Sequence, residues 1–375
     1  MSGALVELVA KGVQDAYLTG DPEVSFFHQA YKRHTNFAQK PVPIQYTGTA
    51  GSSQQINMKL LNKGDLLGYV WMDLGLPTAT ATVASLQDTI FELYIGGQLI
   101  DRQDGFYMTQ LWQKFLVDSS AKGFAGSGGG LWDGTSSVNS ILRAKWLPLH
   151  FFFCDSMCYL PLVALQYHEV EVRITFGSGY PASSPVNMYA NYVVLDTSER
   201  DAIVKKEHDI LIEQVQRIPA NSPPVNGANN KFDLSLLNHP VKCLLWGIPG
   251  ATNKFVSSTV QLYVNGTELF ENEMPDVYFS TVQTYYHSEY AAITQGGISD
   301  TTTTSSPNLK MYSFALKASK HQPCGTCNFS RLDTASLTFK TEFDMVTPPS
   351  DIYLYAVNFN VFRIKNGLGG LAFSS

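Results

Sequence analysis

The chain has 375 residues, of which 44% are hydrophobic, 12% aromatic and 15% charged, with a formal net charge of −6. This length suits one large or two medium domains, and the hydrophobic fraction excludes a chain that is disordered by composition. Because no basic run exceeds Lys32-Arg33 or Lys205-Lys206, nucleic-acid binding along the whole chain is not expected. The charged fraction, below the about 25% of an average domain, suits extensive interfaces, although β-rich proteins are also poor in Lys and Glu.

The N-terminal segment from Ser2 to Gln14 is predicted to be helical, because its apolar residues recur at helical spacing. We expect an arm that docks on a partner; the alternative is a terminal helix that packs on its own domain. A turn is predicted at Thr19-Gly20-Asp21-Pro22. The apolar positions of the helix are Leu5, Leu8, Val9 and Val13.

From about residue 40 onward, the chain consists mainly of predicted strands, rich in β-branched and aromatic residues and bounded by Gly, Pro, Asn and Asp. The best internal helix is Gly105 to Val117, where Met108, Leu111, Trp112 and Phe115 share a face. The fold class is therefore all-β, with antiparallel sandwiches favoured over βαβ units. The predicted strands are Gln55–Leu61, Leu67–Leu74, Ile90–Ile95, Val170–Phe176, Met188–Leu195, Ile210–Gln216, Val260–Val264, Leu337–Phe343 and Ile352–Ile364.

An internal repeat divides the chain into two similar halves joined near Thr197–Lys206. Four short matches occur in the same order in both halves, which predicts two copies of one strand layout. In each half a Gly-Gly or Asn-Gly pair suits a tight hairpin turn with positive φ. The matches are Leu60-Leu61-Asn62 with Leu236-Leu237-Asn238, Trp71 with Trp246, Leu93–Gly97 with Leu262–Gly266, and Tyr189–Tyr192 with Tyr355–Phe359.

Three polar or Gly-rich segments are predicted to be exposed loops: Gly123–Gly134, Ile218–Asn230 and Gly296–Pro307. The first contains the Gly-rich run 126–130, which lacks the Gly-Lys-Ser/Thr ending of a phosphate-binding loop. We interpret it as a flexible surface loop.

Two motifs with metal-ligand residue types have structural interpretations. Cys324-Gly325-Thr326-Cys327 lacks two further zinc ligands, although His321 lies three residues upstream, and Cys154 and Cys158 are distant. It is interpreted as a turn with unpaired thiols, and five cysteines, an odd number, indicate a reducing compartment. His168-Glu169-Val170-Glu171 alternates as a strand, so that Glu169, Glu171 and Arg173 share the polar face.

The Asn265-Gly266-Thr267 and Asn328-Phe329-Ser330 segments fit the glycosylation sequon, and a hairpin turn accounts for the first. No Gly-x-Ser-x-Gly elbow and no paired carboxylates stand out. The sequence therefore offers no candidate catalytic residue, no cofactor-binding residue and no metal ligand, and we expect a protein that is not an enzyme.

Segments spread over nearly the whole chain resemble the major capsid proteins of nucleocytoplasmic large DNA viruses, such as the phycodnaviruses and iridoviruses. This chain is shorter than many members, so small outward loops are expected, and Cys324 stands where the family often has Ser. The matching segments are Gly3–Val6, Gln14–Gly20, Phe26-Phe27, Tyr31–Phe37, Ile95–Gln98, Leu162–Val170, Asn238–Val241, Tyr312–Lys317, His321–Pro323, Gly325–Arg331 and Gly367–Phe373.

The resemblance implies a double jelly roll, with an N-terminal arm at 1–25 and two tandem eight-stranded jelly rolls at 26–200 and 201–375, and with short helices in the loops. It also implies a homotrimer that forms a pseudo-hexagonal capsomer of an icosahedral virion shell, assembled in the host cytoplasm. The implied partners are further copies of the chain, neighbouring capsomers, minor capsid proteins and a nearby internal membrane, with no sequence-specific nucleic acid and no cofactor.

Two alternatives remain open at this point. A minor capsid paralogue of the same fold would share every motif and would differ in copy number per virion. A glycan-binding β-sandwich would act as a monomer with an exposed aromatic platform.

Overall fold

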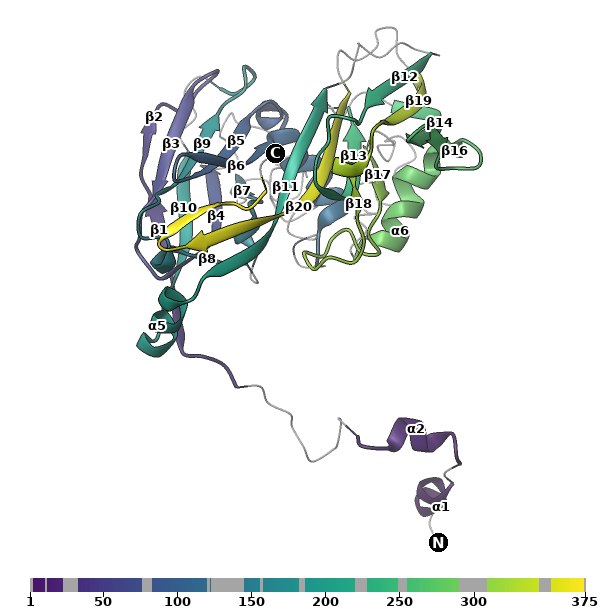
Figure 1. The fold of residues 1–375 in the computed structure, drawn as a ribbon, viewed down its shortest axis with the longest axis horizontal. Coiled ribbons are helices and arrows are strands. Elements are labelled where there is room, and N and C mark those ends of the chain that lie inside the picture. Colours follow the sequence, from purple (N-terminus) through teal and green to yellow (C-terminus); the bar gives the residue numbers. More distant parts are fainter. Residues whose placement is uncertain are drawn as a thin grey trace. The chain divides into compact units, whose positions relative to one another are not determined.

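The structure is a computed structural model, in which residues Met1–Phe37 and Ala38–Ser375 form two separate units. Figure 1 shows its elements in chain order. It describes residues 3–10, 12–22, 33–75, 83–119, 122, 145–155, 158–181, 186–219, 228–248, 255–289, 309–343 and 352–373.

The N-terminal unit contains two short helices, α1 (Gly3–Val9) and α2 (Asp15–Thr19). The prediction of one helix reaching Gln14 is wrong in extent, because α1 ends at Val9. Gly12 is a poor helix former, and its N–H donates to Asp15 Oδ2 at 2.7 Å instead of continuing the helix. The predicted turn is confirmed, since α2 ends at Thr19 and Asp21 has φ 45°.

The N-terminal half of the second unit contains two antiparallel sheets. One has the strand order β1-β10-β4-β7, with β8 added on β4, and the other has the order β2-β3-β9-β5-β6. The strand bounds are β1 Phe37–Ile44, β2 Tyr46–Gly48, β3 Gln55–Leu60, β4 Leu66–Gly75, β5 Ile90–Ile95, β6 Gln98–Asp104, β7 Lys145–Pro148, β8 Leu160–Pro161, β9 Val170–Thr175 and β10 Asn187–Leu195.

The C-terminal half contains two more antiparallel sheets. Their orders are β11-β20-β13-β17, with β18 and β21 at the side, and β12-β19-β14-β15, with β16 on β14. The bounds are β11 His208–Pro219, β12 Asn229–Asp233, β13 Pro240–Gly247, β14 Phe255–Val264, β15 Thr267–Glu268, β16 Met274–Pro275, β17 Leu309–Ser313, β18 Cys327–Asn328, β19 Ala335–Phe343, β20 Tyr353–Lys365 and β21 Leu368–Leu371.

The two halves share one strand layout. In each half, the eight main strands can be numbered in chain order. One sheet then has the order first, eighth, third, sixth, and the other has the order second, seventh, fourth, fifth. This arrangement is the double Greek key of a jelly roll. Thus β1, β4, β7 and β10 have counterparts in β11, β13, β17 and β20. The four sequence matches fall at counterpart places, so the predicted double jelly roll is confirmed, with helix α5 (Thr197–Lys205) as the connection.

Every strand predicted by periodicity is present, with shifts of one to three residues at most ends, except that β14 begins five residues before the predicted Val260. Two of the strands that were not predicted carry residues that mask the pattern: β1 contains Pro41 and Pro43, and β6 contains five charged or amide side chains in seven residues. The predicted loop Ile218–Asn230 is shorter than expected, because its ends belong to β11 and β12. The loops predicted at Gly123–Gly134 and Gly296–Pro307 lie outside the described residues.

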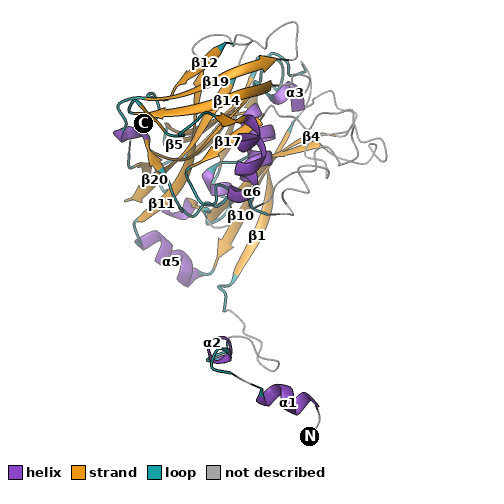
Figure 2. Ribbon diagram, turned by 90° about the vertical axis from the view of Figure 1, so that its right-hand side faces the viewer, coloured by secondary structure: helices purple, strands orange, loops and turns teal. Residues whose placement is uncertain are grey.

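The predicted helix after Gly105 is confirmed, but Tyr107–Leu116 forms a π-helix, η1, with Met108, Leu111 and Phe115 buried. Figure 2 shows the strands forming the bulk of the second unit, with α6 on the face that is turned toward the viewer. The remaining helices are α3 Val83–Leu86, η3 Phe152–Cys154, η4 Leu162–Ala164, η5 Tyr278–Val282, α6 Gln283–His287 and η6 Phe329–Arg331.

Both predicted hairpin turns are confirmed. Gly96 and Gly97 have φ 59° and 80°, and they join β5 to β6. Asn265 and Gly266 have φ 48° and 78° at the counterpart position between β14 and β15. Positive φ at two successive residues is the requirement of a type I′ turn, which only Gly, Asn and Asp meet readily.

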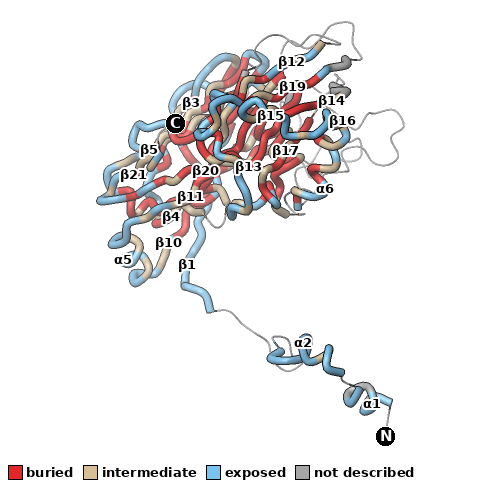
Figure 3. Tube along the Cα trace, turned by 45° about the vertical axis from the view of Figure 1, so that its right-hand side comes forward, coloured by how far each residue is buried: buried red, intermediate tan, exposed pale blue. Residues whose placement is uncertain are grey.

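In the sheet β11-β20-β13-β17, the strands β13 and β17 and most of β20 are buried on both faces, whereas β11 and most strands of the first jelly roll alternate between buried and open positions. Leu354 and Ala356 of β20 point into the core of the second jelly roll. Tyr355 and Val357 on the opposite face belong to a larger core that also fills the first jelly roll. Figure 3 shows β13 and most of β20 as buried. The core of the first jelly roll therefore extends onto one face of this sheet, and the core of the second jelly roll lies on its other face.

Candidate functional site

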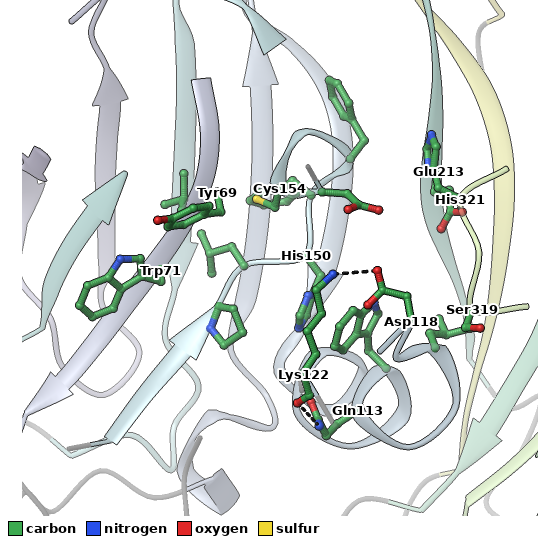
Figure 4. Close-up of a pocket in the computed structure, with 18 of the residues that line it drawn as sticks. Tyr69, Trp71, Gln113, Asp118, Lys122, His150, Cys154, Glu213, Ser319 and His321 are labelled. Carbon is green, nitrogen blue, oxygen red and sulfur yellow. Dashed lines mark hydrogen bonds and ion pairs between the residues drawn. The ribbon is translucent and has the colours of Figure 1, made fainter. Parts of the chain in front are cut away.

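A pocket of about 790 Å³ lies where the two jelly rolls meet. Figure 4 shows Tyr69 and Trp71 of the first jelly roll on one side of this pocket, and Glu213 and His321 of the second jelly roll on the other. Helix η1 and the segment after β7 line the space between them. Its walls are mainly apolar, with the aromatic residues Trp112, Trp146, Phe151 and Phe152 as further members.

Three ionisable side chains of the second jelly roll meet at the pocket. Lys242 Nζ lies 2.5 Å from Glu213 Oε1, and His321 Nδ1 lies 3.5 Å from the same oxygen. Burial opposes ionisation of Glu213, but Lys242 and His321 hold the pKa of its carboxyl below the usual value. Hydrogen bonding to Cys158 and Glu213 raises the pKa of His321 to about 10. The cluster therefore holds one anion between two cations at neutral pH.

The first jelly roll contributes a neutral histidine to the pocket. The ring of His150 stacks on Trp112 with centroids 3.7 Å apart. Burial lowers the pKa of His150 to about 3, so the ring is uncharged at neutral pH. Its Nε2 atom is buried and has no hydrogen-bond partner among the described residues. Nearby, Lys122 Nζ forms an ion pair of 2.9 Å with Asp118.

A second polar group joins the jelly rolls through β6. The hydroxyl of buried Tyr355 donates to the carboxylate of Asp104, with its oxygen 2.7 Å and 2.8 Å from the two carboxylate oxygens, and Arg217 donates to the same carboxylate at 3.1 Å. Asp101 accepts a hydrogen bond from the Val215 N–H at 3.0 Å and one from Gln103 at 2.7 Å. Burial raises the pKa of both carboxyls, to about 7 for Asp101. These contacts hold β6 against β11 and β20.

The motifs considered in the sequence lie apart from one another. All five cysteines are free, and within the part of the chain that the structure describes no three His, Cys, Asp or Glu side chains are placed to hold a metal ion. His321 contacts Glu213 of β11 instead of forming a group with Cys324 and Cys327. Glu169 pairs with Lys59 at 2.7 Å and Glu171 with Arg173 at 3.2 Å, which confirms the predicted polar strand face.

The two sequons occupy turns. Asn265 Oδ1 accepts hydrogen bonds from the backbone N–H groups of Asp333 and Thr334, so this side chain fixes the hairpin. Asn328 Oδ1 accepts from the Ser330 N–H at the start of η6. Of the helices in the described ranges, none is long and apolar enough to cross a membrane. The Gly-rich run 126–130 lies outside the described residues.

Sequence reasoning missed the charged residues of the junction. Lys242 lies in the otherwise apolar strand Pro240–Gly247, and its side chain is 3% exposed. A lysine within such an apolar run was the available signal, because a buried cation requires a partner. Its partner Glu213 could not be identified from spacing, since it lies 29 residues away on another strand.

Comparisons with known proteins agree along the chain. A family model described as "Large eukaryotic DNA virus major capsid protein" matches residues 199–370, and one described as "Major capsid protein N-terminus" matches residues 25–196. The chain is 33% identical to the major capsid protein of Pyramimonas orientalis virus and 30% identical to that of Paramecium bursaria Chlorella virus 1. Each alignment covers 100% of both chains.

Solved structures show the same fold. The chain matches the quasi-atomic model of the PBCV-1 virus capsid with a TM-score of 0.74 and 25% identity, over 94% of this chain and 100% of that one. The Faustovirus major capsid protein matches with a TM-score of 0.65 and 12% identity, over 96% of each chain, which is a likeness of fold.

Proposed function

This chain belongs to the family of major capsid proteins of large eukaryotic DNA viruses, and from that premise we propose that three copies form one pseudo-hexagonal capsomer of an icosahedral shell. Its role in the virion is structural. The observation that supports a trimer is that the two jelly rolls within one unit have the same strand order. Three such chains present six similar blocks, which can close into a ring around a three-fold axis.

The proposal includes the domain boundaries: an arm at 1–25, a first jelly roll at 26–200 and a second at 201–375. It is supported by the strands themselves, since β1 to β10 lie between Phe37 and Leu195 and β11 to β21 lie between His208 and Leu371. The connecting helix α5 is preceded by its N-cap Asp196, whose side chain accepts a hydrogen bond from the Thr197 N–H.

We propose that the N-terminal arm contacts minor capsid proteins or a neighbouring capsomer at the base of the shell, near an internal membrane. Support comes from its apolar side chains, which are exposed in the single chain and would gain stability by burial against a partner. They are Leu5, Val6, Val9, Val13, Tyr17 and Leu18, with exposures from 51% to 91%.

Three further statements complete the proposal. The protein acts without catalysis, it binds no specific nucleic-acid sequence, and it assembles in the host cytoplasm. The first is supported by the family, whose curated members are named for the capsid. The second is supported by the net charge of −6, which does not favour binding to a polyanion.

Light scattering on the purified protein tests the trimer. We expect a mass of about 124 kDa, three times the 41.4 kDa of the chain, that persists on dilution. A stable particle of 41.4 kDa would contradict the capsomer and favour a minor capsid role or a glycan-binding module. Copy number per virion separates a minor from a major capsid protein, and glycan binding by the monomer would identify the glycan-binding module.

A further inference from the structure

Within one chain, helix η1 of the first jelly roll covers the outer face of the second. Tyr355 on that face is 1% exposed, and its ring centroid lies 5.6 Å from that of Tyr107. Lys114 Nζ donates to the backbone oxygen of Leu309 in β17, and the Ser288 hydroxyl donates to the backbone oxygen of Phe115 at 3.0 Å. The strands β20, β13 and β17 are thereby buried on both sides.

The counterpart face on the first jelly roll is partly exposed in the single chain. It consists of the outward side chains of β10, β4 and β7, the counterparts of β20, β13 and β17. Tyr69 is 43% exposed, whereas Val70 and Met72, which point inward, are fully buried. Trp71 and Tyr189 stack with centroids 4.5 Å apart. We define this aromatic face as Tyr69, Trp71, Trp146, Pro148 and Tyr189.

Four members of the aromatic face, all except Tyr189, also line the pocket shown in Figure 4. The pocket is therefore continuous with the aromatic face.

The helical segment at the counterpart place in the second jelly roll is less buried than η1. Helices η5 and α6 lie between β16 and β17, as η1 lies between β6 and β7. Helix η1 has seven buried residues among its ten, but η5 has only Phe279, and α6 has only Gln283 and Thr284. Helix α6 exposes the α6 patch, which we define as Tyr285 at 69% and Tyr286 at 64%.

We propose that the α6 patch of one copy docks on the aromatic face of a second copy, so that the contact made by η1 inside each chain is repeated between chains. This inference rests on the proposed capsomer and identifies its interface. Each copy offers one patch and one face, which makes the contact head-to-tail and allows a ring to close. The six jelly rolls of the ring are then related by rotations of about 60°, and contacts within a chain alternate with contacts between chains around the ring.

The chemistry of the two surfaces fits a protein interface. Tyr and Trp are enriched where partner proteins bury most of their binding energy, because they bring large apolar area at low entropic cost. The second copy is favoured as the occupant because the chain already contains the same type of contact, made by a counterpart helix on a counterpart sheet.

Photo-crosslinking from the α6 patch tests the interface directly. Tyr286 is replaced by p-benzoylphenylalanine, the protein is mixed with an isotope-labelled copy, and crosslinked peptides are identified by mass spectrometry. We expect links between copies to residues 69–73, 146–150 or 187–189. The same photoreactive residue at Tyr167, which is 73% exposed, serves as the matched control and is expected not to crosslink to these segments.

A double variant, Tyr285→Ser with Tyr286→Ser, supplies a quantitative readout. We expect trimers to dissociate at a protein concentration at least tenfold higher, while the circular dichroism of the chain stays unchanged. A trimer whose crosslinks from Tyr286 reach other segments would overturn this interface and leave the capsomer proposal standing. A chain that remains monomeric before any substitution would overturn both.

Discussion

Two buried carboxyls, Asp101 and Asp104, lie where the jelly rolls meet. Each is at most 5% exposed and accepts hydrogen bonds from the second jelly roll. Burial raises their pKa values, because a carboxylate loses hydration in the interior, and hydrogen bonds offset only part of that loss. The strength of this junction therefore depends on the protonation of single residues.

The first prediction concerns Asp101→Asn. The pKa of Asp101 is about 7 in the folded chain, whereas the unfolded chain has the ordinary value of 3.8. Between these two pH values the folded protein therefore retains a proton that the unfolded chain releases. The free energy of unfolding should therefore fall between about pH 4 and pH 7, by at most ~4 kcal/mol, and level off above pH 7. Melting temperatures across this window should fall less steeply in the variant than in the natural protein.

Asp233→Asn is the matched control, since this partly exposed carboxyl at the end of β12 has a pKa below its usual value, held there by Ser235. Its stabilising effect is lost only below about pH 4, so the slope from pH 4 to pH 7 should be unchanged. An Asp101→Asn variant with the same slope as the natural protein would contradict the assignment.

The second prediction compares two buried tyrosines. Tyr355→Phe removes the hydroxyl that donates to Asp104, and should cost about 1–3 kcal/mol because a buried carboxylate loses a donor. Tyr192→Phe is the control: the Tyr192 hydroxyl is buried without a hydrogen-bond partner among the described residues, so its loss should be neutral or stabilising. Denaturant titration of both variants measures the difference, and equal losses would refute the role of Tyr355.

At the scale of elements, the junction depends on how β6 passes into η1. Gly105 joins the two, and its N–H donates to the Thr89 oxygen at 2.8 Å while the Phe106 N–H donates to the Gln87 oxygen at 3.1 Å. These bonds hold the start of η1 against the segment that follows α3. The close approach of two backbones leaves no room for a side chain at Gly105.

The third prediction is that Gly105→Ala destabilises the protein by ~3 kcal/mol or more, because the new Cβ would overlap the carbonyl group of Leu86. Gly179→Ala is the control, since its Cβ would meet only Ser85 Cα at 3.9 Å. Melting temperatures of the two variants give the comparison. If the two substitutions had equal effects, the tight approach at Gly105 would not be supported.

At the scale of the whole molecule, residues Met1–Phe37 form a unit separate from the double jelly roll. The fourth prediction is that deletion of residues 2–20 leaves the mass of the trimer unchanged, because both surfaces of the proposed interface lie in the second unit. Shell assembly should fail or give irregular particles. Light scattering measures the first effect and electron microscopy of assembled particles the second; a deletion variant that cannot trimerise would contradict this role of the arm.

Much of the fold could be predicted from the sequence, because the signals that define it are local. Alternation along Val170–Phe176 requires only that one face be buried, and Asn265-Gly266 requires only a positive φ at two successive positions. The order of four matches then indicated two copies of one layout. Local signals failed where proline and charged residues interrupted alternation, as in β1 and β6.

The double layout, the main strands and the family resemblance were thus determined by the sequence alone, whereas the junction between the jelly rolls was decided only by the tertiary structure. Tyr355 and Asp104 are 251 residues apart, and no spacing rule pairs them. Periodicity separates the two faces of a strand, but whether the second face meets solvent or another sheet depends on packing between distant segments. For that reason most of β20 is buried on both faces, while the counterpart face at Trp71 and Tyr189 is only half-buried in the single chain.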